Sequence, residues 1–280
     1  MENNSVFSDL DWQTIQFKDA IEFMAKKLDI AVELRAQVAA ALQETAFYVT
    51  GMVRADAIAQ VHDSLNTIIT AGGSFADFKR DFKAIAEKTG FQPREGVSAR
   101  AAVVFETNMH SALNAGIMQG MRQTVSTRPY ASLLTAGGAR TCGNCSMMSG
   151  VTMTIQQWDG RGGPPFHHRC RCELRSFSVP QLEKYGLKPF DPDKDTMPLK
   201  DKKGQVVRQV SMKDTYSYKD PRTGKVENIP VGISPGFNYA KGLGGTQVVN
   251  DTLQAKISSL PAYIQPTVKA DFANPPDSSS

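Results

Sequence analysis

The sequence predicts an α+β fold: a mainly helical N-terminal body, a small module of loops and strands, and an irregular C-terminal extension. Apolar residues recur at helical spacing through the first third of the chain, which predicts helices there. Short strand-like runs surround a group of cysteines in the middle, and the last hundred residues are rich in Pro, Gly, Lys and Asp. We therefore predict three regions, 1–128, 129–179 and 180–280.

The bulk composition narrows the class of protein. The 280 residues are 41% hydrophobic, which is enough for a sizeable core and for one or two domains. No apolar run reaches the length needed to cross a bilayer, and the first residues lack the basic stretch and apolar core of a signal peptide. We expect a soluble protein that folds in the cytoplasm of the producing cell and has no membrane partner. The net charge of +4, without a dense basic block, permits nucleic-acid binding but does not indicate it.

The N-terminal body is predicted to consist of successive helices. The first covers 17–28, and a longer periodic stretch covers about 31–70, either as one helix or as two with a kink at Gly51. Glycines at 72 and 73 end it. Ser74 then caps a further helix, with Asp77 placed for a capping box and Gly90 closing it. The apolar stripe of that helix is predicted to be core rather than a partner groove, and it consists of Phe75, Phe78, Phe82 and Ile85.

Beyond these helices the pattern becomes less regular. A helix is expected from Ser98 to about Gln123, and 160–165 reads as a tight turn. The remaining predicted elements are strands at 130–134, 173–179 and 205–210, a hairpin at 216–229, a short helix at 251–260, and a disordered tail at 274–280.

The four cysteines all lie in one short segment, arranged as C-x-x-C and then C-x-C beside two histidines. Paired cysteines next to histidines are typical of a metal site, and disulfides are disfavoured in a reducing cytoplasm. A structural zinc ion needs four nitrogen or sulfur ligands in a tetrahedron. The pattern therefore predicts one structural zinc ion; the alternative is a set of buried free thiols with two surface histidines.

More side chains are available than a tetrahedral ion needs. We favour Cys142, Cys145, His167 and Cys170 as the zinc ligands. Alternates are His168 and Cys172, because two residues separated by one position in an extended segment point the same way.

The sequence around the cluster lacks the marks of a catalytic metal. We find neither H-x-E with P-C-x-x-C nor H-E-x-x-H. Asp159 and Glu173 flank the cluster, but carboxylates near a metal loop are usually solvated. His62 and His110 are single histidines in predicted helices, which favours surface or satisfied core positions over ligation. We therefore predict no enzymatic activity, no catalytic residues and no cofactor other than zinc.

A polar triplet in the helix at 98–123 has two interpretations. Thr107 and Asn108, which follow Glu106, could tie this helix to the metal module by hydrogen bonds, or they form an ordinary polar helix face. Arg169 and Arg171, within the cysteine cluster, could contact either DNA or a carboxylate. The residues alone leave these alternatives open.

The cluster resembles a known signature. Residues 140–145 (R-T-C-G-N-C) and 164–172 (P-P-F-H-H-R-C-R-C) resemble the C-terminal signature of the phage Mu F-like minor head proteins, except that His168 stands where that family often has proline. Other stretches agree in the same order. They are 17–23, 75–82, the E-T-N triplet at 106–108 with Ala115-Gly116, and the later S-P-G-F-N-Y at 234–239.

The resemblance implies a head morphogenesis role in a tailed phage. Such a protein would be associated with the portal inside the capsid and would act in assembly or in DNA packaging or ejection. The implied partners are the portal protein, with the scaffold or major capsid protein and DNA as further candidates. The implied location is the virion, after a period in the host cytoplasm during assembly. Two rival functions stay open: a zinc-dependent nuclease, and a virion-delivered effector directed at the host.

Overall fold

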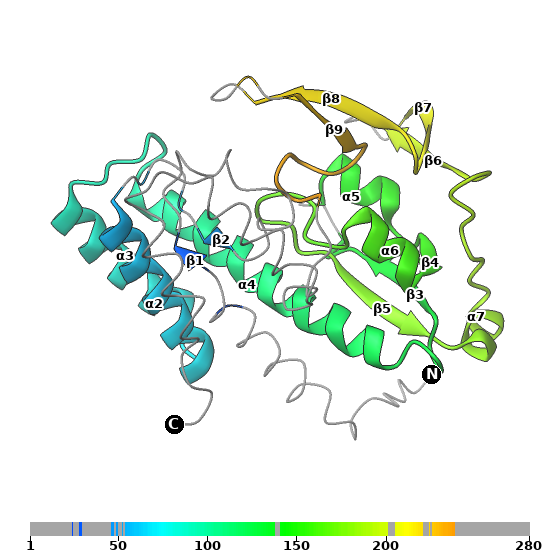
Figure 1. Cartoon of the computed structure of the whole chain (residues 1–280), viewed down its shortest axis with the longest axis horizontal. Helices are drawn as coiled ribbons and strands as arrows, with labels where there is room; N and C mark the ends of the chain where they lie inside the picture. The colour runs from blue at the N-terminus through cyan, green and yellow to red at the C-terminus, as the bar shows by residue number, and fades with distance from the viewer. Residues whose placement is uncertain are drawn as a thin grey trace, which may run out of the picture.

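The computed structural model describes residues 54–137, 141–200, 205–220, 224 and 226–238, together with 24, 28–29, 46–47, 49 and 52. The predicted helix at 251–260, the predicted tail at 274–280 and most of the predicted helix at 17–28 lie outside these residues. Within them the chain combines helices with antiparallel strands, so the predicted α+β class is confirmed (Figure 1). None of the described helices is long and apolar enough to cross a membrane.

Three helices form the helical body: α2 (Ala55–Ala71), α3 (Phe75–Thr89) and α4 (Val97–Gln123). Helices α2 and α3 pack beside the first half of α4, and α4 then continues towards the strands (Figure 1). One apolar cluster joins the three helices. It includes Ile58, Leu65, Phe78, Phe82, Ala101 and Val104.

The boundaries of α3 follow from local hydrogen bonds. The Ser74 hydroxyl oxygen accepts the Asp77 N–H at 3.3 Å, and the Asp77 carboxylate accepts the Ser74 N–H at 3.0 Å. Gly90 adopts φ 71°, a left-handed conformation that glycine reaches without a side-chain clash. The predicted capping box and helix end are therefore confirmed. Phe78 and Phe82 are fully buried as predicted, whereas Phe75 is 36% exposed and packs against Phe105.

The predicted helical stretch at about 31–70 is wrong at the residues before Ala55 that the structure describes, and 31–45 lie outside the described residues. Residues 46–47 form a short strand, β2, which pairs in parallel with β1 (Leu28–Asp29), and α2 begins only at Ala55. Leu28 is therefore also not the end of a helix. The apolar spacing reflected real burial at Val49, which belonged to the predicted stripe and is fully buried. However, 46–50 is rich in aromatic and β-branched side chains, which favour extended backbone.

A three-stranded antiparallel sheet lies at the far end of α4. Its order is β4 (Thr152–Thr154), β3 (Tyr130–Leu134) and β5 (Glu173–Phe177). Strand β3 was predicted with these bounds. Strand β5 stops at Phe177 rather than at 179, because Ser178 caps helix α7 (Val179–Tyr185).

Two short helices in this module were not predicted. Helix α5 (Gly143–Met148) follows β3, and α6 (Ile155–Arg161) follows β4. Helix α6 extends into the segment 160–165, which was predicted to be a tight turn. In the structure the turn begins at Gly162, where the helix ends. Thr154 and Gln157 form a capping box that starts α6.

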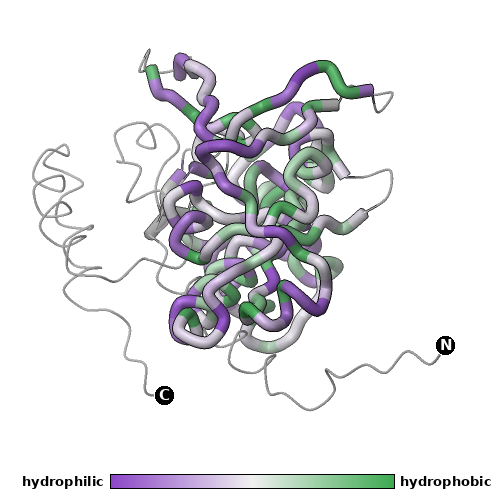
Figure 2. The backbone as a smooth tube through the Cα atoms, turned by 90° about the vertical axis from the view of Figure 1, so that its right-hand side faces the viewer, coloured by the Kyte–Doolittle hydropathy of each residue, from purple (hydrophilic) through white to green (hydrophobic). Residues whose placement is uncertain are grey.

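Two antiparallel hairpins follow at one end of the molecule (Figures 1 and 2). The first pairs β6 (Thr196–Lys200) with β7 (Val206–Ser211), and the second pairs β8 (Thr215–Lys219) with β9 (Val226–Pro230). Strand β7 and the second hairpin were predicted, but β6 was missed. The described part of the C-terminal region is therefore more regular than the sequence indicated.

A second apolar cluster joins these hairpins to the sheet. It includes Met118 and Met121 of α4, Leu133, Trp158, Phe166, Leu174, and the C-terminal residues Met197, Val210, Ile229, Ile233 and Phe237. Helix α4 therefore contributes to both apolar clusters. The three predicted regions stay predictions, but residues on both sides of position 180 share this cluster.

Candidate metal centre

The first two cysteines are positioned by the start of α5. Cys142 is the N-cap residue of this helix, with extended backbone, and its sulfur accepts the N–H of Cys145 at 3.4 Å. An N-cap side chain folds back over the first helical turn. The C-x-x-C spacing thus brings both sulfurs to the same side of the helix end.

The other donors come from the loop between α6 and β5. In this loop the Cys170 N–H donates to the His167 carbonyl at 3.1 Å, closing a tight turn. Arg169 inside the turn has a φ of 60°, which is uncommon for a residue with a side chain. The His167 Nδ1 lies 2.8 Å from the His168 carbonyl oxygen, and because a carbonyl only accepts, Nδ1 carries the proton. The Nε2 atom is then left as an electron-pair donor, as a metal-binding histidine requires.

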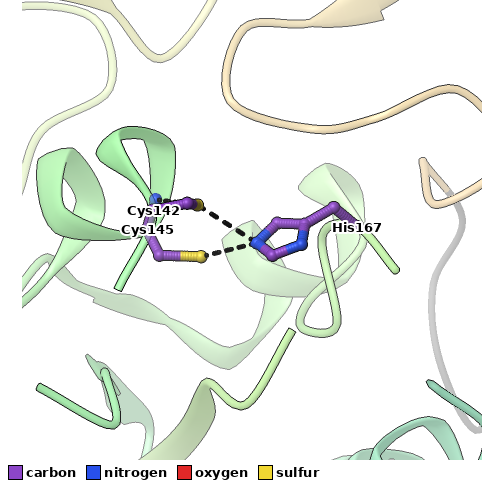
Figure 3. A group of neighbouring side chains, drawn as sticks. All are labelled: Cys142, Cys145 and His167. Carbon is purple, nitrogen blue, oxygen red and sulfur yellow. Dashed lines mark hydrogen bonds between the residues drawn. The ribbon is translucent and has the colours of Figure 1, made fainter. Parts of the chain in front are cut away.

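These donors meet around Cys145, and Figure 3 shows three of them, Cys142, Cys145 and His167. The His167 Nε2 lies 3.1 Å from the Cys142 sulfur and 3.2 Å from the Cys145 sulfur. The Cys145 sulfur is also 3.8 Å from the Cys170 sulfur. Two overlapping groups have all their donor atoms within 4.8 Å of one another, one with Cys142, Cys145 and His167 and the other with Cys145, Cys170 and Cys172.

The donor set fits a zinc ion. Sulfur ligands about 2.3 Å from a tetrahedral zinc lie about 3.8 Å apart, which is the separation of the Cys145 and Cys170 sulfurs. Nitrogen and sulfur ligands of such an ion lie about 3.5 Å apart, so His167 would move back by a few tenths of an ångström. Thiolate and imidazole are the ligands that structural zinc prefers.

The electrostatics of the cluster also favour a cation. A hydrogen bond from Cys145 lowers the pKa of Cys142 to about 4 and lowers the pKa of Cys170, while the pKa of Cys145 itself is raised by its hydrogen bond to Cys142. The hydrogen bond with Cys142 raises the pKa of His167 to about 10. These neighbours thus compete for a few protons. A divalent ion removes this competition, because coordination deprotonates thiols and takes the imidazole in its neutral form.

Five of the predicted candidates are brought together, and His168 is not among them. The rings of His168 and Phe237 lie 5.0 Å apart, edge to face, and His168 belongs to neither donor group found in the described part of the chain. Cys172 shares a donor group with Cys145 and Cys170. The set Cys142, Cys145, His167 and Cys170 stays our prediction, with Cys172 as its competitor.

Helix α4 contacts the loop between α6 and β5, residues 162–172, named here the metal-binding loop after its predicted role. These contacts were not fixed by the sequence. Arg169 donates to the Glu106 carboxylate through two nitrogens, at 2.7 and 3.0 Å, and its backbone N–H donates to the Thr107 hydroxyl at 3.1 Å. Of the two alternatives left open for the polar triplet, the tie to this loop holds for Thr107, and the partner of Arg169 is a carboxylate. For Asn108 the other alternative holds, because its amide donates to the Val104 carbonyl of its own helix.

Asn114 is a second contact between α4 and this loop, and the sequence did not reveal it. Its side chain is buried, and its amide nitrogen donates to the carbonyl oxygens of Cys172, at 3.1 Å, and of His110, at 2.9 Å. A buried amide is retained where it has hydrogen-bond partners. The signal in the sequence was an asparagine on the inner side of an otherwise apolar helix segment.

The remaining polar residues near the cluster have other partners. Asp159 forms an ion pair with Arg122 at 2.6 Å, and Glu173 is exposed at the start of β5. His62 is buried with its Nε2 2.8 Å from the Met24 carbonyl, which confirms a satisfied core position. Burial lowers the pKa of His110, which is half-buried on α4.

We predict that Arg169→Ala weakens metal binding. The substitution removes both hydrogen bonds to Glu106, and loss of groups that support metal ligands typically costs about 10-fold or more in affinity. Competition with a chromophoric chelator measures the dissociation constant. The matched control is Arg80→Ala, which breaks an exposed ion pair with Asp77 on α3. An unchanged affinity in Arg169→Ala would contradict a supporting role for this contact.

The fold and this site define an α+β protein in which a long helix supports a cysteine–histidine cluster suited to one metal ion. Residues 59–175 match the family described as Phage Mu protein F like protein, so the resemblance is confirmed over that segment. The match begins in α2, ends in β5 and contains every predicted ligand, while both hairpins lie outside it. Neither the curated proteins nor the solved structures contain a match.

Proposed function

We propose that this protein is a minor head protein of a tailed phage that acts in head morphogenesis. The observation that carries the proposal is the family match over 59–175, which encloses the whole cysteine–histidine cluster and the helix that supports it. More specifically, we propose that the protein binds the portal inside the capsid and contributes to assembly or to DNA packaging or ejection. Scaffold and major capsid proteins are further partners.

We propose that zinc has a structural role in this protein. The ligands come from the start of α5 and from the loop before β5, so an ion would join segments that are 25 residues apart in sequence, counted from Cys145 to Cys170, but adjacent in space. Small modules with short helices and few strands often need such a staple. The carboxylate of Asp159 is paired with Arg122, which leaves it poorly placed to act as a general base. We therefore propose no enzymatic activity.

Co-purification with the portal protein tests the assembly role. The chain and the portal protein encoded by the same phage are co-expressed, and one of them carries an affinity tag. We expect the two to elute together in size-exclusion chromatography, and heads assembled without this chain to be defective. Portal that elutes alone, with normal heads in the absence of the chain, would contradict the proposal. Metal-dependent cleavage of DNA by the purified protein would instead favour the nuclease alternative.

A further inference from the structure

We propose that residues 231–237, named here the cover, close over the metal-binding loop and set how fast its metal exchanges. The cover follows β9 directly and lies outside the segment that matches the family. The inference rests on the proposed metal site, and it assigns a role to a segment of the C-terminal region.

The cover contacts both neighbours of the predicted ligand His167. The Ser234 N–H donates to the Phe166 carbonyl at 2.8 Å, on one side of the ligand. On the other side, the Phe237 ring meets the His168 ring edge to face at 5.0 Å. The two contacts therefore bracket the position from which His167 reaches the sulfurs.

The inner face of the cover is apolar and buried. Ile233 and Phe237 are almost fully buried, and they belong to the same apolar cluster as Cys145, Cys170 and Cys172. Water or a chelator needs to reach a metal ion before the ion can leave. Apolar side chains packed around a site restrict that access. A closed cover therefore slows exchange without supplying a ligand.

The other side of the cover is fastened to the rest of the protein. The buried Arg161 guanidinium of α6 donates to the carbonyl oxygens of Val231 and Met212, the latter at 2.7 Å. The Tyr216 hydroxyl donates to the Ile233 carbonyl at 2.8 Å. Gly232 has a φ of 92°, a conformation that residues with a side chain rarely adopt, so glycine is favoured at this bend.

This arrangement permits opening without global unfolding. The hydrogen bond from Ser234 and the ring contact of Phe237 join the cover to the metal-binding loop, whereas the hydrogen bonds of Val231 and Ile233 run to α6, to Asp214 and to the strand β8. Local opening breaks only the contacts of this segment, so its free energy is lower than that of unfolding the whole protein. Metal exchange is then limited by the opening of the cover.

Metal release tests the proposal. The protein, loaded with zinc, is mixed with excess chromophoric chelator, and the release rate is followed by absorbance for wild type, Phe237→Ala and the milder Phe237→Leu. We expect the same starting metal content and a release rate about 10-fold higher in Phe237→Ala, with Phe237→Leu in between. The matched control is Phe91→Ala, which removes a similar edge-to-face ring contact, with Phe82, in the other apolar cluster.

The results of the release experiment distinguish the role of the cover from the presence of the zinc site. Release at the wild-type rate in both Phe237 variants, from normally loaded protein, overturns the cover alone and leaves the proposed zinc site standing. Equal acceleration in Phe91→Ala also overturns it, because release would then follow general stability. A protein that takes up no zinc overturns the cover together with the zinc site. Portal binding is not needed for the assay, so the head-assembly proposal is tested separately.

Hydrogen exchange gives a second measurement in the unmodified protein. If closing of the cover and binding of the metal are coupled, the bound metal must favour the closed cover by the same factor by which the closed cover favours the bound metal. We expect metal removal to speed amide exchange in 231–237, at Ser234 above all, by about 10-fold or more. Unchanged exchange in this segment after metal removal would overturn the proposal.

Discussion

Replacing Cys145 with serine is expected to abolish metal binding and to unfold the part of the protein built around the three-stranded sheet. Cys145 is the one residue shared by both donor groups, with its sulfur 3.2 Å from the His167 Nε2 and 3.8 Å from the Cys170 sulfur. Binding of structural zinc contributes about 10–16 kcal/mol in small zinc-dependent domains. Metal content and a thermal scan by circular dichroism measure the two effects.

Two further cysteine variants test which residues complete the ligand set. Cys142→Ser is expected to lose the metal, whereas Cys172→Ser is expected to keep it, because we assign the fourth place to Cys142. Loss of metal in Cys172→Ser with retention in Cys142→Ser would transfer that place to Cys172. Metal bound at the wild-type level by Cys145→Ser would contradict the whole assignment.

The second large effect is expected for Trp158→Ala. The Trp158 side chain is fully buried in α6, packs near Phe166, and donates its indole N–H to the Ala131 carbonyl at 2.9 Å. Truncating a buried tryptophan costs about 3–5 kcal/mol, because it removes apolar contacts and leaves a cavity. We expect the free energy of unfolding, measured with urea, to fall by that amount.

Two further variants control this measurement. Trp158→Phe keeps most of the ring but loses the donor to Ala131, so we expect an intermediate loss of stability. Tyr185→Ala removes an aromatic side chain that is 52% exposed, and a change within about 0.5 kcal/mol is expected. A Trp158→Ala protein as stable as Tyr185→Ala would contradict the central position of Trp158 in the core.

The elements that could be predicted from sequence are those specified by nearby residues. Helix α3 begins and ends where predicted, since Ser74 and Asp77 form its capping box and Gly90 takes the left-handed conformation that ends it. Strand β3 was also predicted with its observed bounds. In both cases the deciding interactions or patterns lie within a few residues in the chain.

Other elements depended on distant contacts or were too short for a periodic pattern. Val49 belonged to the helical spacing predicted for 31–70, but it is buried on non-helical backbone beside β2. Helices α5 and α6 have only 6 and 7 residues, fewer than two full turns. The capping box of Thr154 and Gln157 was nevertheless a usable local signal for α6.

In the candidate site, too, local sequence patterns were predictive and contacts between distant residues were not. Cysteine spacing predicted which side chains gather, because C-x-x-C and C-x-C are local patterns. Spacing could not reveal that Phe237 packs against His168, or that Glu106 of α4 holds Arg169. Each of these pairs is far apart in sequence, so no local pattern could reveal it. The choice between Cys142 and Cys172 as a ligand is likewise decided by three-dimensional packing.

The central claim is that this cluster holds a structural zinc ion, and elemental analysis of the purified protein tests it most directly. The chain is expressed without added metal, purified under reducing conditions, passed over a mild chelating resin and analysed by inductively coupled plasma mass spectrometry. We predict about one zinc ion per chain, retained until the protein unfolds. A well-folded protein that contains no zinc, with all its thiols free to react with a thiol reagent, would contradict the account.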